Sequence, residues 1–182
     1  PGDRSAAILD FGCGRGHFLA YLHAKGYSRI EGFDVIPSYA RKIQEETGAK
    51  VHTAASSREF LEARTGVYDA VAAIDVLEHV LPSEQPALLK EIHGALKPGG
   101  RIIISGPHAA SITGIYTRYA DATHTTCFTL SSLAWLLEGA GFRNPRAVLP
   151  RFPLKMRPGR LVLTVLRSIW FAVLGAIFFI EA

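Results

Sequence analysis

Hydrophobic positions along the chain follow two periods, one typical of buried strands and one typical of amphipathic helices. Short apolar runs predict five strands, at residues 6–10, 29–34, 50–53, 68–74 and 101–105. Apolar residues that recur every three or four positions predict five helices, at residues 18–25, 37–47, 57–63, 82–96 and 129–140. Such regular alternation predicts an α/β fold in which an open, mostly parallel sheet carries helices on both faces.

Three glycines alternate with other residues directly after the first predicted strand. Gly12, Gly14 and Gly16 allow the backbone to turn tightly and to approach a ligand that a Cβ atom would exclude. A dinucleotide fingerprint would place its third glycine where His17 stands, and a Walker A loop would need Gly-Lys-Ser/Thr, which this chain lacks. A ligand without a pyrophosphate therefore fits the loop better than NAD or ATP. The alternative is that the glycines only form a tight strand–helix turn.

Two aspartates lie close to this loop in the predicted sheet. Asp34 stands 24 residues beyond Asp10, at the end of the second strand, where a carboxylate can accept hydrogen bonds from both ribose hydroxyls of a nucleotide. Asp10 lies at the loop itself, where its charge suits a positive group on the ligand, directly or through water. Together they favour a nucleoside with cationic groups over a phosphate. A turn or helix-capping role is the alternative for Asp34.

Four segments resemble, in this order, the motifs of class I S-adenosylmethionine-dependent methyltransferases. They read ILDFGCGRG at 8–16, GFD at 32–34, YDAVAAIDVLEHV at 68–80 and LKPGG at 96–100. The resemblance covers residues 6–106. It implies a Rossmann-like fold, S-adenosylmethionine as the cofactor, S-adenosylhomocysteine as its product and methyl transfer as the activity.

The resemblance also implies where the cofactor binds. The glycine loop, with Cys13 inside it, would run against the methionine part and the ribose. Asp34 would bind the ribose hydroxyls, while Val35 and Ile36 would pack on the face of the adenine.

The methionine end of the cofactor would be lined by the segment after the fourth strand, with Asp75 and Leu77. Many family members hold the adenine amino group with an acid after the third strand, but this chain has alanines and serines there, so Ser56 or backbone groups would take that place. The expected cofactor-binding residues are Asp10, Gly12, Cys13, Gly14, Gly16, Asp34, Val35, Ile36, Ser56, Asp75 and Leu77.

Histidines near the predicted carboxyl ends of the strands are the candidate catalytic residues. Methyl transfer to an alcohol needs an in-line arrangement of oxygen and methyl group, and it benefits from a general base. His108 and His124 follow the fifth strand, at the edge where α/β sheets bind substrates. We expect His124 to act as the base or to position the hydroxyl, with His108 as a second candidate. His79, after the fourth strand, either organises its loop or contacts the substrate.

Cysteine content and charge narrow the class of protein further. Cys13 and Cys127 make no disulfide framework and stand at no metal-ligand spacing from histidine, so a reducing compartment and chemistry without a metal are expected. Residues 1–142 carry a net charge of −2 and residues 143–182 carry +6. Because the basic residues introduce an apolar stretch, we expect a membrane surface or an anionic lipid-linked substrate and no nucleic-acid partner.

Residues 161–180 are mostly apolar and carry one charge, Arg167, and their longest uncharged run is shorter than the ~20 residues that cross a bilayer. We therefore expect a methyltransferase core over residues 1–142 and a basic C-terminal apolar helical extension over 143–182, in the same domain and truncated before a final strand. Residues 150–182 either pack on the domain or on a second subunit, or lie in a membrane interface. The expected location is the cytoplasm, in the last case peripheral to the inner face of the membrane.

The region from 120 to 142 contains a Thr-His stretch and an Ala-Gly-Phe turn, and it resembles methyltransferases of sugar and cell-surface polysaccharide pathways. The sequence thus predicts O-methylation of a sugar or glycan intermediate, as a small molecule or linked to lipid, near the membrane. One alternative is a quinone-like or other apolar small-molecule acceptor, and another is a non-catalytic S-adenosylmethionine-binding subunit. His17 in place of a glycine argues against a nicotinamide-dependent oxidoreductase.

Overall fold

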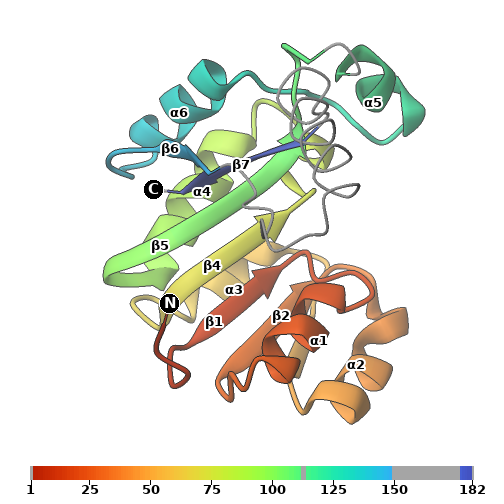
Figure 1. Cartoon of the computed structure of the whole chain (residues 1–182), viewed down its shortest axis with the longest axis vertical. Coiled ribbons are helices and arrows are strands. Elements are labelled where there is room, and N and C mark those ends of the chain that lie inside the picture. Colours follow the sequence, from red (N-terminus) through yellow and green to blue (C-terminus); the bar gives the residue numbers. More distant parts are fainter. Residues whose placement is uncertain (1, 112–113, 149–176, 182) are drawn as a thin grey trace, which may run out of the picture.

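The computed structural model describes residues 2–111, 114–148 and 177–181. Within them, one seven-stranded sheet has the order β3-β2-β1-β4-β5-β7-β6 (Figure 1). The strands are β1 (Ile8–Phe11), β2 (Ile30–Asp34), β3 (Lys50–Thr53), β4 (Tyr68–Ile74), β5 (Leu96–Pro107), β6 (Arg146–Val148) and β7 (Ile177–Glu181). The first five pair in parallel, and β7 runs antiparallel between β5 and β6.

Helices cover both faces of the sheet, as the alternation in the sequence predicts. The helices are α1 (His17–Ala24), α2 (Ala40–Thr47), α3 (Ser57–Glu62), α4 (Gln85–Ala95), α5 (Gly114–Ala120) and α6 (Leu130–Gly139), and short 3-10 turns η1 (Pro37–Tyr39) and η2 (Leu77–His79) follow β2 and β4. α1 and α2 pack on one face, whereas α3, α4 and α6 pack on the other. α5 lies beyond the carboxyl end of β5 (Figure 1).

Two hydrophobic cores hold these layers together, one on each face of the sheet. Alternate side chains of β1 supply both, because successive residues of a strand point to opposite faces. Leu9 and Phe11 enter the core under α3, α4 and α6, while Ile8 enters the core under α1 and α2. The strands at the centre of the parallel sheet are therefore apolar on both sides, as parallel strands usually are.

Helix ends follow local chemistry that the sequence shows only in part. Ser56 caps α3 through its side chain, which accepts a hydrogen bond from the Arg58 N–H, as a serine before that helix predicts. At α6 the cap is Thr129, and Ser132 in the first turn completes a reciprocal capping box with it. α4 begins at Gln85 with Pro86 in its first turn, and not at Pro82 as expected.

The C-terminal part differs from the sequence-based prediction at two described segments. Residues 143–182 were expected to form an apolar helical extension, but residues 146–148 form β6 and residues 177–181 form β7, which pairs with β5 and β6. An uninterrupted apolar run is compatible with a buried strand as well as with a buried helix, and sheet pairing decides between them. Residues 149–176 and 182 of the expected extension lie outside the described residues. Among the described helices, none has the length and hydrophobicity that crossing a membrane requires.

Candidate active site

The loop between β1 and α1 is folded back over the end of β2. The amides of Gly12 and Cys13 both donate to the Phe33 carbonyl, at 2.8 and 3.0 Å. Gly12, Gly14 and Gly16 all have positive φ angles, of 76°, 48° and 77°. This left-handed conformation favours glycine at each position.

The three glycines nevertheless differ in what surrounds them. A Cβ atom at Gly16 would lie 2.6 Å from Ile43 of α2, and one at Gly12 would overlap Val76. At Gly14 a Cβ atom would meet no atom within 4 Å. Gly12 and Gly16 are thus required by packing, whereas Gly14 borders open space.

Asp34 joins this loop to the end of β2. One carboxylate oxygen accepts the Gly14 N–H at 2.7 Å, and the other accepts the Ile36 N–H at 2.8 Å. Each oxygen keeps a further lone pair, because a carboxylate has about four acceptor sites. Directly after it, Val35 and Ile36 are each 57% exposed, which is unusual for two adjacent aliphatic residues at a strand end. The two oxygens of Asp34 are thus hydrogen-bond acceptors that lie next to an exposed apolar surface.

Asp10 lies under the loop, with a side chain that is only 3% exposed. Burial, together with the negative charge of Asp34, raises the pKa of its carboxyl from 3.8 to about 7. A buried carboxyl of this kind ionises more readily when a cation binds near it.

Two of the expected cofactor-binding residues point their side chains into the protein interior. Cys13 is buried beside Gly32, whose missing Cβ leaves room for the sulfur, and burial raises the pKa of the thiol to about 12. Leu77 in η2 is 2% exposed and belongs to the core under α4. Either residue can therefore face a ligand only through its backbone, while its side chain shapes the floor of the site.

Asp75 follows β4 in a strained conformation, with φ at 54° and an exposed side chain. Its backbone N–H donates to the Ser105 carbonyl at 3.1 Å, and its carboxylate accepts the Ser105 hydroxyl at 2.9 Å. Residues other than glycine that adopt a strained backbone conformation are often found at functional sites. Ser56, by contrast, uses its side chain as the cap of α3.

The structure brings His79 and His124 together, although 45 residues separate them in the sequence. Their ring centroids lie 4.7 Å apart. Nδ1 of His124 lies 3.0 Å from the Thr117 carbonyl of α5, and Nδ1 of His79 lies 2.8 Å from the Thr123 hydroxyl, which itself donates to Asp121. A carbonyl and a hydroxyl whose proton is engaged can only accept, so Nδ1 is the donor in both rings, and in the neutral form of each ring Nε2 carries the lone pair.

Glu78 lies beside these histidines and is almost fully buried, with 1% of its surface exposed. Its Oε2 atom has no hydrogen-bond partner among the described residues. Burial, with smaller contributions from the charges of Asp75 and Asp121, raises the pKa of the carboxyl to about 7. The ligand atoms of Glu78, His79 and His124 all lie within 4.8 Å of one another.

Polar side chains fix the segment that carries this cluster. The Thr125 hydroxyl lies 2.7 Å from the Val80 carbonyl and 3.0 Å from the Glu78 carbonyl. Gln85, 2% exposed, donates its amide to the Leu77 and Val80 carbonyls at 3.1 and 3.0 Å. The turn after β4 and the loop before α6 are therefore held as one unit. Sequence reasoning missed Gln85, because only the fold places its amide beneath the turn.

His108, the second candidate base, follows β5 directly and forms an isolated parallel bridge with Phe128. Its carbonyl accepts the Ser111 N–H and hydroxyl, at 3.0 and 2.9 Å. The ring is half-buried. Of the two predicted catalytic histidines, His124 is the one that belongs to the cluster with Glu78.

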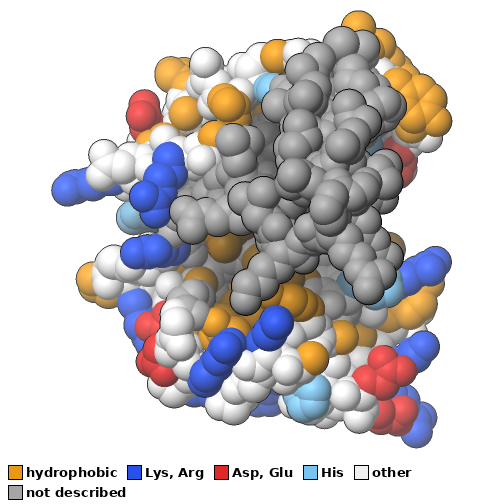
Figure 2. Space-filling model, in the orientation of Figure 1, with side chains coloured by type: hydrophobic (Ala, Val, Ile, Leu, Met, Phe, Trp, Pro, Cys, Tyr) orange, Lys and Arg blue, Asp and Glu red, His pale blue; other side chains and the backbone are white. Residues whose placement is uncertain are grey.

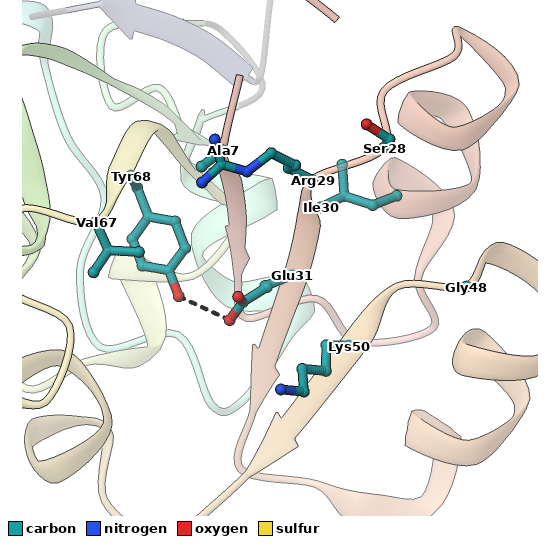
Figure 3. Close-up of a pocket in the computed structure, with 9 residues that line it drawn as sticks. All are labelled: Ala7, Ser28, Arg29, Ile30, Glu31, Gly48, Lys50, Val67 and Tyr68. Carbon is teal, nitrogen blue, oxygen red and sulfur yellow. Dashed lines mark hydrogen bonds between the residues drawn. The ribbon is translucent and has the colours of Figure 1, made fainter. Parts of the chain in front are cut away.

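A hollow of about 300 Å³ lies at the opposite end of the sheet, where Ile30, Lys50 and Tyr68 begin their strands. Figure 3 shows the Tyr68 hydroxyl donating to the Glu31 carboxylate inside it. Glu31 also binds His52 at 3.0 Å, so its charge is already engaged. Because α/β sheets bind ligands at the carboxyl ends of their strands, this hollow is not the candidate active site.

Comparison with known proteins agrees with the geometry. A family model described as "Methyltransferase domain" matches residues 1–146. A solved S-adenosylmethionine-dependent methyltransferase from Archaeoglobus fulgidus superposes with a TM-score of 0.74 and 22% identity, covering 98% of this chain and 86% of that one. At 22% sequence identity, this structural similarity supports the assignment of the fold alone.

Curated relatives agree on methyl transfer and differ in acceptor. The ribosomal protein L11 methyltransferase of Burkholderia ambifaria is 30% identical over 122 residues, which are 63% of this chain and 37% of that protein. The ubiquinone biosynthesis O-methyltransferase of Xanthomonas oryzae pv. oryzae is 34% identical over 104 residues, which are 55% of this chain and 42% of that protein. The chain thus spans about two fifths of the length of these relatives, and their names assign a protein acceptor to one and a role in ubiquinone synthesis to the other.

Proposed function

The chain belongs to the class I S-adenosylmethionine-dependent methyltransferases, and we propose that it methylates a hydroxyl group of a small-molecule acceptor. It uses S-adenosylmethionine and releases S-adenosylhomocysteine. We propose a hydroxyl acceptor because of His124, which lies at the carboxyl edge of the sheet. Its Nδ1 is hydrogen-bonded to the Thr117 carbonyl, so its Nε2 is available to act as a base. A thiolate acceptor, which is already deprotonated, would need no such base.

For the cofactor, the proposal places the ribose on Asp34 and the adenine on Val35 and Ile36. The two carboxylate oxygens of Asp34 have lone pairs left for the ribose hydroxyls, and the exposed aliphatic pair offers a flat apolar surface. Gly14 leaves the space that the cofactor would fill. Asp10 lies where ionisation would stabilise the positive charges of the methionine part.

Three further positions complete this cofactor assignment. Asp75 and the backbone of η2 would line the methionine end, because they follow β4 at the same edge of the sheet. The Cys13 backbone would contribute from within the glycine loop. Ser56 already accepts a hydrogen bond from Arg58, so a contact to the adenine amino group would use its backbone or a second lone pair.

The reaction is an in-line displacement at the methyl carbon. The acceptor oxygen gives its proton to His124 Nε2, forms a bond to the methyl carbon, and the carbon–sulfur bond breaks toward a neutral thioether. General-base assistance of this kind contributes typically 10²–10⁴-fold. His108 is the second candidate, since it follows the neighbouring strand β5.

For the acceptor we propose a sugar or glycan intermediate, with a quinone-like molecule as the second candidate. The Thr-His segment and the basic residues 143–182 support the first. The second is supported by the ubiquinone-pathway relative and by the surface of α5, where Ile115, Tyr116 and Tyr119 are between 71% and 76% exposed. Figure 2 shows hydrophobic side chains over α5 at the upper right of this face.

Methyl transfer from labelled S-adenosylmethionine to hydroxylated acceptors tests the proposal. We expect turnover with a free sugar, a lipid-linked sugar or a catechol-type quinol, and a fall of about 10²–10⁴-fold in kcat for His124→Gln. His23→Gln, at an exposed position of α1, is the matched control and should keep full turnover. If none of the acceptors is methylated although the cofactor binds, the protein is a binding subunit and the proposal is wrong. Turnover that His124→Gln leaves unchanged would remove the base assignment.

A further inference from the structure

We propose that Glu78, His79 and His124 form a binding site for a divalent transition-metal ion. Their ligand atoms come from two segments, the turn after β4 and the loop before α6, and lie within 4.8 Å of one another. Two imidazoles and one carboxylate are a ligand set that suits zinc, iron or manganese better than calcium, which prefers oxygen ligands alone. The site revises the sequence-based expectation of chemistry without a metal, which considered only cysteine–histidine spacing.

The strongest single sign of a missing ligand is the carboxyl group of Glu78. It is almost completely buried, yet its Oε2 has no hydrogen-bond partner among the described residues. A buried polar atom without a partner is costly, and native proteins seldom keep one without a reason. Gly106 of β5 lies against this carboxyl group, and a Cβ there would come within 3.3 Å of Oε2. A bound cation would supply the missing interaction.

Both histidines are already oriented as metal ligands usually are. Such histidines donate one ring N–H to a carbonyl, a carboxylate or a similar group, which fixes the other nitrogen as the ligand atom. His124 donates to the Thr117 carbonyl, and His79 donates to Thr123, whose hydroxyl donates to Asp121 at 2.7 Å. The series of hydrogen bonds from His79 through Thr123 thus ends at the negatively charged carboxylate of Asp121, close to the site.

The spacing requires only a small closure. Zinc bonds of about 2.0–2.1 Å would bring the ligand atoms to roughly 3.4 Å from one another, so each pair, now within 4.8 Å, would approach by at most about 1.4 Å. Thr125 and Gln85 tie the two ligand-bearing segments to each other and keep them in register. Three protein ligands leave at least one coordination position open, as in catalytic metal sites.

The use of this metal rests on the proposed function. An acceptor with two neighbouring oxygens, such as a vicinal diol or a catechol, can occupy the open positions. The metal would lower the pKa of the bound hydroxyl, whose proton would pass to solvent water, and the oxygen would then attack the methyl carbon while the carbon–sulfur bond breaks. With the metal bound, His124 would be a ligand, so the proposed methyl transfer to a hydroxyl is kept but the metal replaces His124 as the group that activates it. His79 would then be as important as His124.

Metal binding to the full-length chain, without a histidine tag and freed of metal with a chelator, tests the site directly. Titration calorimetry with Zn²⁺ and with Co²⁺ should give one site per chain. Glu78→Gln, His79→Asn and His124→Asn should each weaken binding at least tenfold, and His23→Asn should not. In wild-type protein with labelled histidines, Zn²⁺ should shift the imidazole NMR signals of two of the seven histidines. Absence of a stoichiometric site, or equal binding by all three variants, would overturn the proposal.

S-adenosylmethionine affinity, measured on the same samples, separates this inference from the proposed function. If the metal-free chain binds the cofactor but no metal, only the metal site is wrong. If metal binds and its removal leaves turnover of a catechol or vicinal diol unchanged, the site exists but its catalytic use is refuted. Loss of turnover in His79→Asn with cofactor affinity retained would support metal ligation over a simple His124 base, because the base mechanism assigns His79 no proton.

Discussion

The Asp34 carboxylate holds the glycine loop, because its two oxygens accept backbone N–H groups at 2.7 and 2.8 Å. In the proposed cofactor site the same two oxygens would also accept the ribose hydroxyls. Hydrogen bonds to a charged group contribute about 1.5–3 kcal/mol. Asp34→Ala should therefore weaken S-adenosylmethionine binding by roughly 10- to 150-fold in titration calorimetry.

Asp69 provides a matched control for this substitution. Its carboxylate also accepts a backbone N–H, from Ala7 at 2.7 Å, and it pairs with Lys97 at 2.7 Å, but it stands at the start of β4, at the opposite edge of the sheet. Asp69→Ala should lower the melting temperature and leave cofactor affinity unchanged. Equal loss of affinity in both variants would mean that Asp34 acts only through the stability of the fold.

If Asp10 contacts the cofactor as proposed, cofactor binding should depend on pH. Its pKa of about 7 lies above the unfolded value of 3.8, so the folded protein holds a proton between these values and its stability falls as pH rises through them. A cationic ligand favours the ionised carboxyl, so S-adenosylmethionine should expel this proton and bind more tightly as pH rises toward about 7. Calorimetry at pH 6 in two buffers of different ionisation enthalpy should show release of most of one proton. Asp10→Asn should abolish the buffer dependence, and no proton release in the wild type would contradict the assignment.

At the scale of residues, spacing along the sequence predicts which residues lie close together when they follow neighbouring strands. The glycine loop and the acid 24 residues after Asp10 lie in adjacent strands, so their proximity follows from pairing β1 with β2. The cluster of His79 and His124 could not be predicted in this way, because only the packing of two distant loops joins them. The burial of Glu78 was equally hidden, since a Glu-His pair after a strand looks the same whether its carboxylate faces solvent or the interior.

The glycine loop is an element whose three glycines should respond differently to substitution. Gly16→Ala places a Cβ atom 2.6 Å from Ile43, so it should destabilise the fold by several kcal/mol through overpacking and a strained φ. Gly14→Ala meets no protein atom, so it should cost only about 1–2 kcal/mol of stability for its positive φ. Cofactor affinity should nevertheless fall in Gly14→Ala, because the new methyl group occupies space that the ligand needs.

Thermal unfolding and calorimetry of the two variants distinguish packing from ligand clearance. The expected pattern is a large loss of melting temperature in Gly16→Ala and a large loss of affinity relative to stability in Gly14→Ala. Gly26→Ala, which also has a positive φ with no neighbour within 4 Å but follows α1, controls for backbone strain alone. Unchanged affinity in Gly14→Ala would show that the open space beside this residue is not part of the cofactor site.

Long periodic elements were predictable, and short or non-periodic ones were not. The predicted strands and helices up to residue 140 all occur, with ends shifted by local capping. α5 was missed because its large apolar residues, Ile115, Tyr116 and Tyr119, are exposed and give no core-facing pattern. β6 has only three residues. β7 was assigned to a helix because its apolar run has no period, and its partners in the sheet are remote in sequence.

On the scale of the whole molecule, the residues proposed to bind the cofactor and the strands that complete the sheet lie in different halves of it. Gly12 and Asp34 belong to the half formed by β1 and β2, whereas β5, β7 and β6 form the other end of the sheet. The general plan of a mostly parallel sheet with helices on both faces follows from alternation alone. The antiparallel end does not, because it requires residues 177–181 to insert between β5 and β6.

A chain that ends at residue 148 tests this division. It lacks β7, so residues 103–107 of β5 lose their backbone partners on that side. An exposed strand edge of this kind can pair with the strands of other molecules. The shortened protein should melt at a lower temperature and associate as its concentration rises in ultracentrifugation. It should still be stabilised by S-adenosylmethionine, because the cofactor half is intact. Phe179→Pro in the full chain, which removes one backbone donor from β7, is the matched variant and should shift the melting temperature in the same direction but less. A shortened chain that stays monomeric and melts like the full one would show that the parallel strands close the fold without β7.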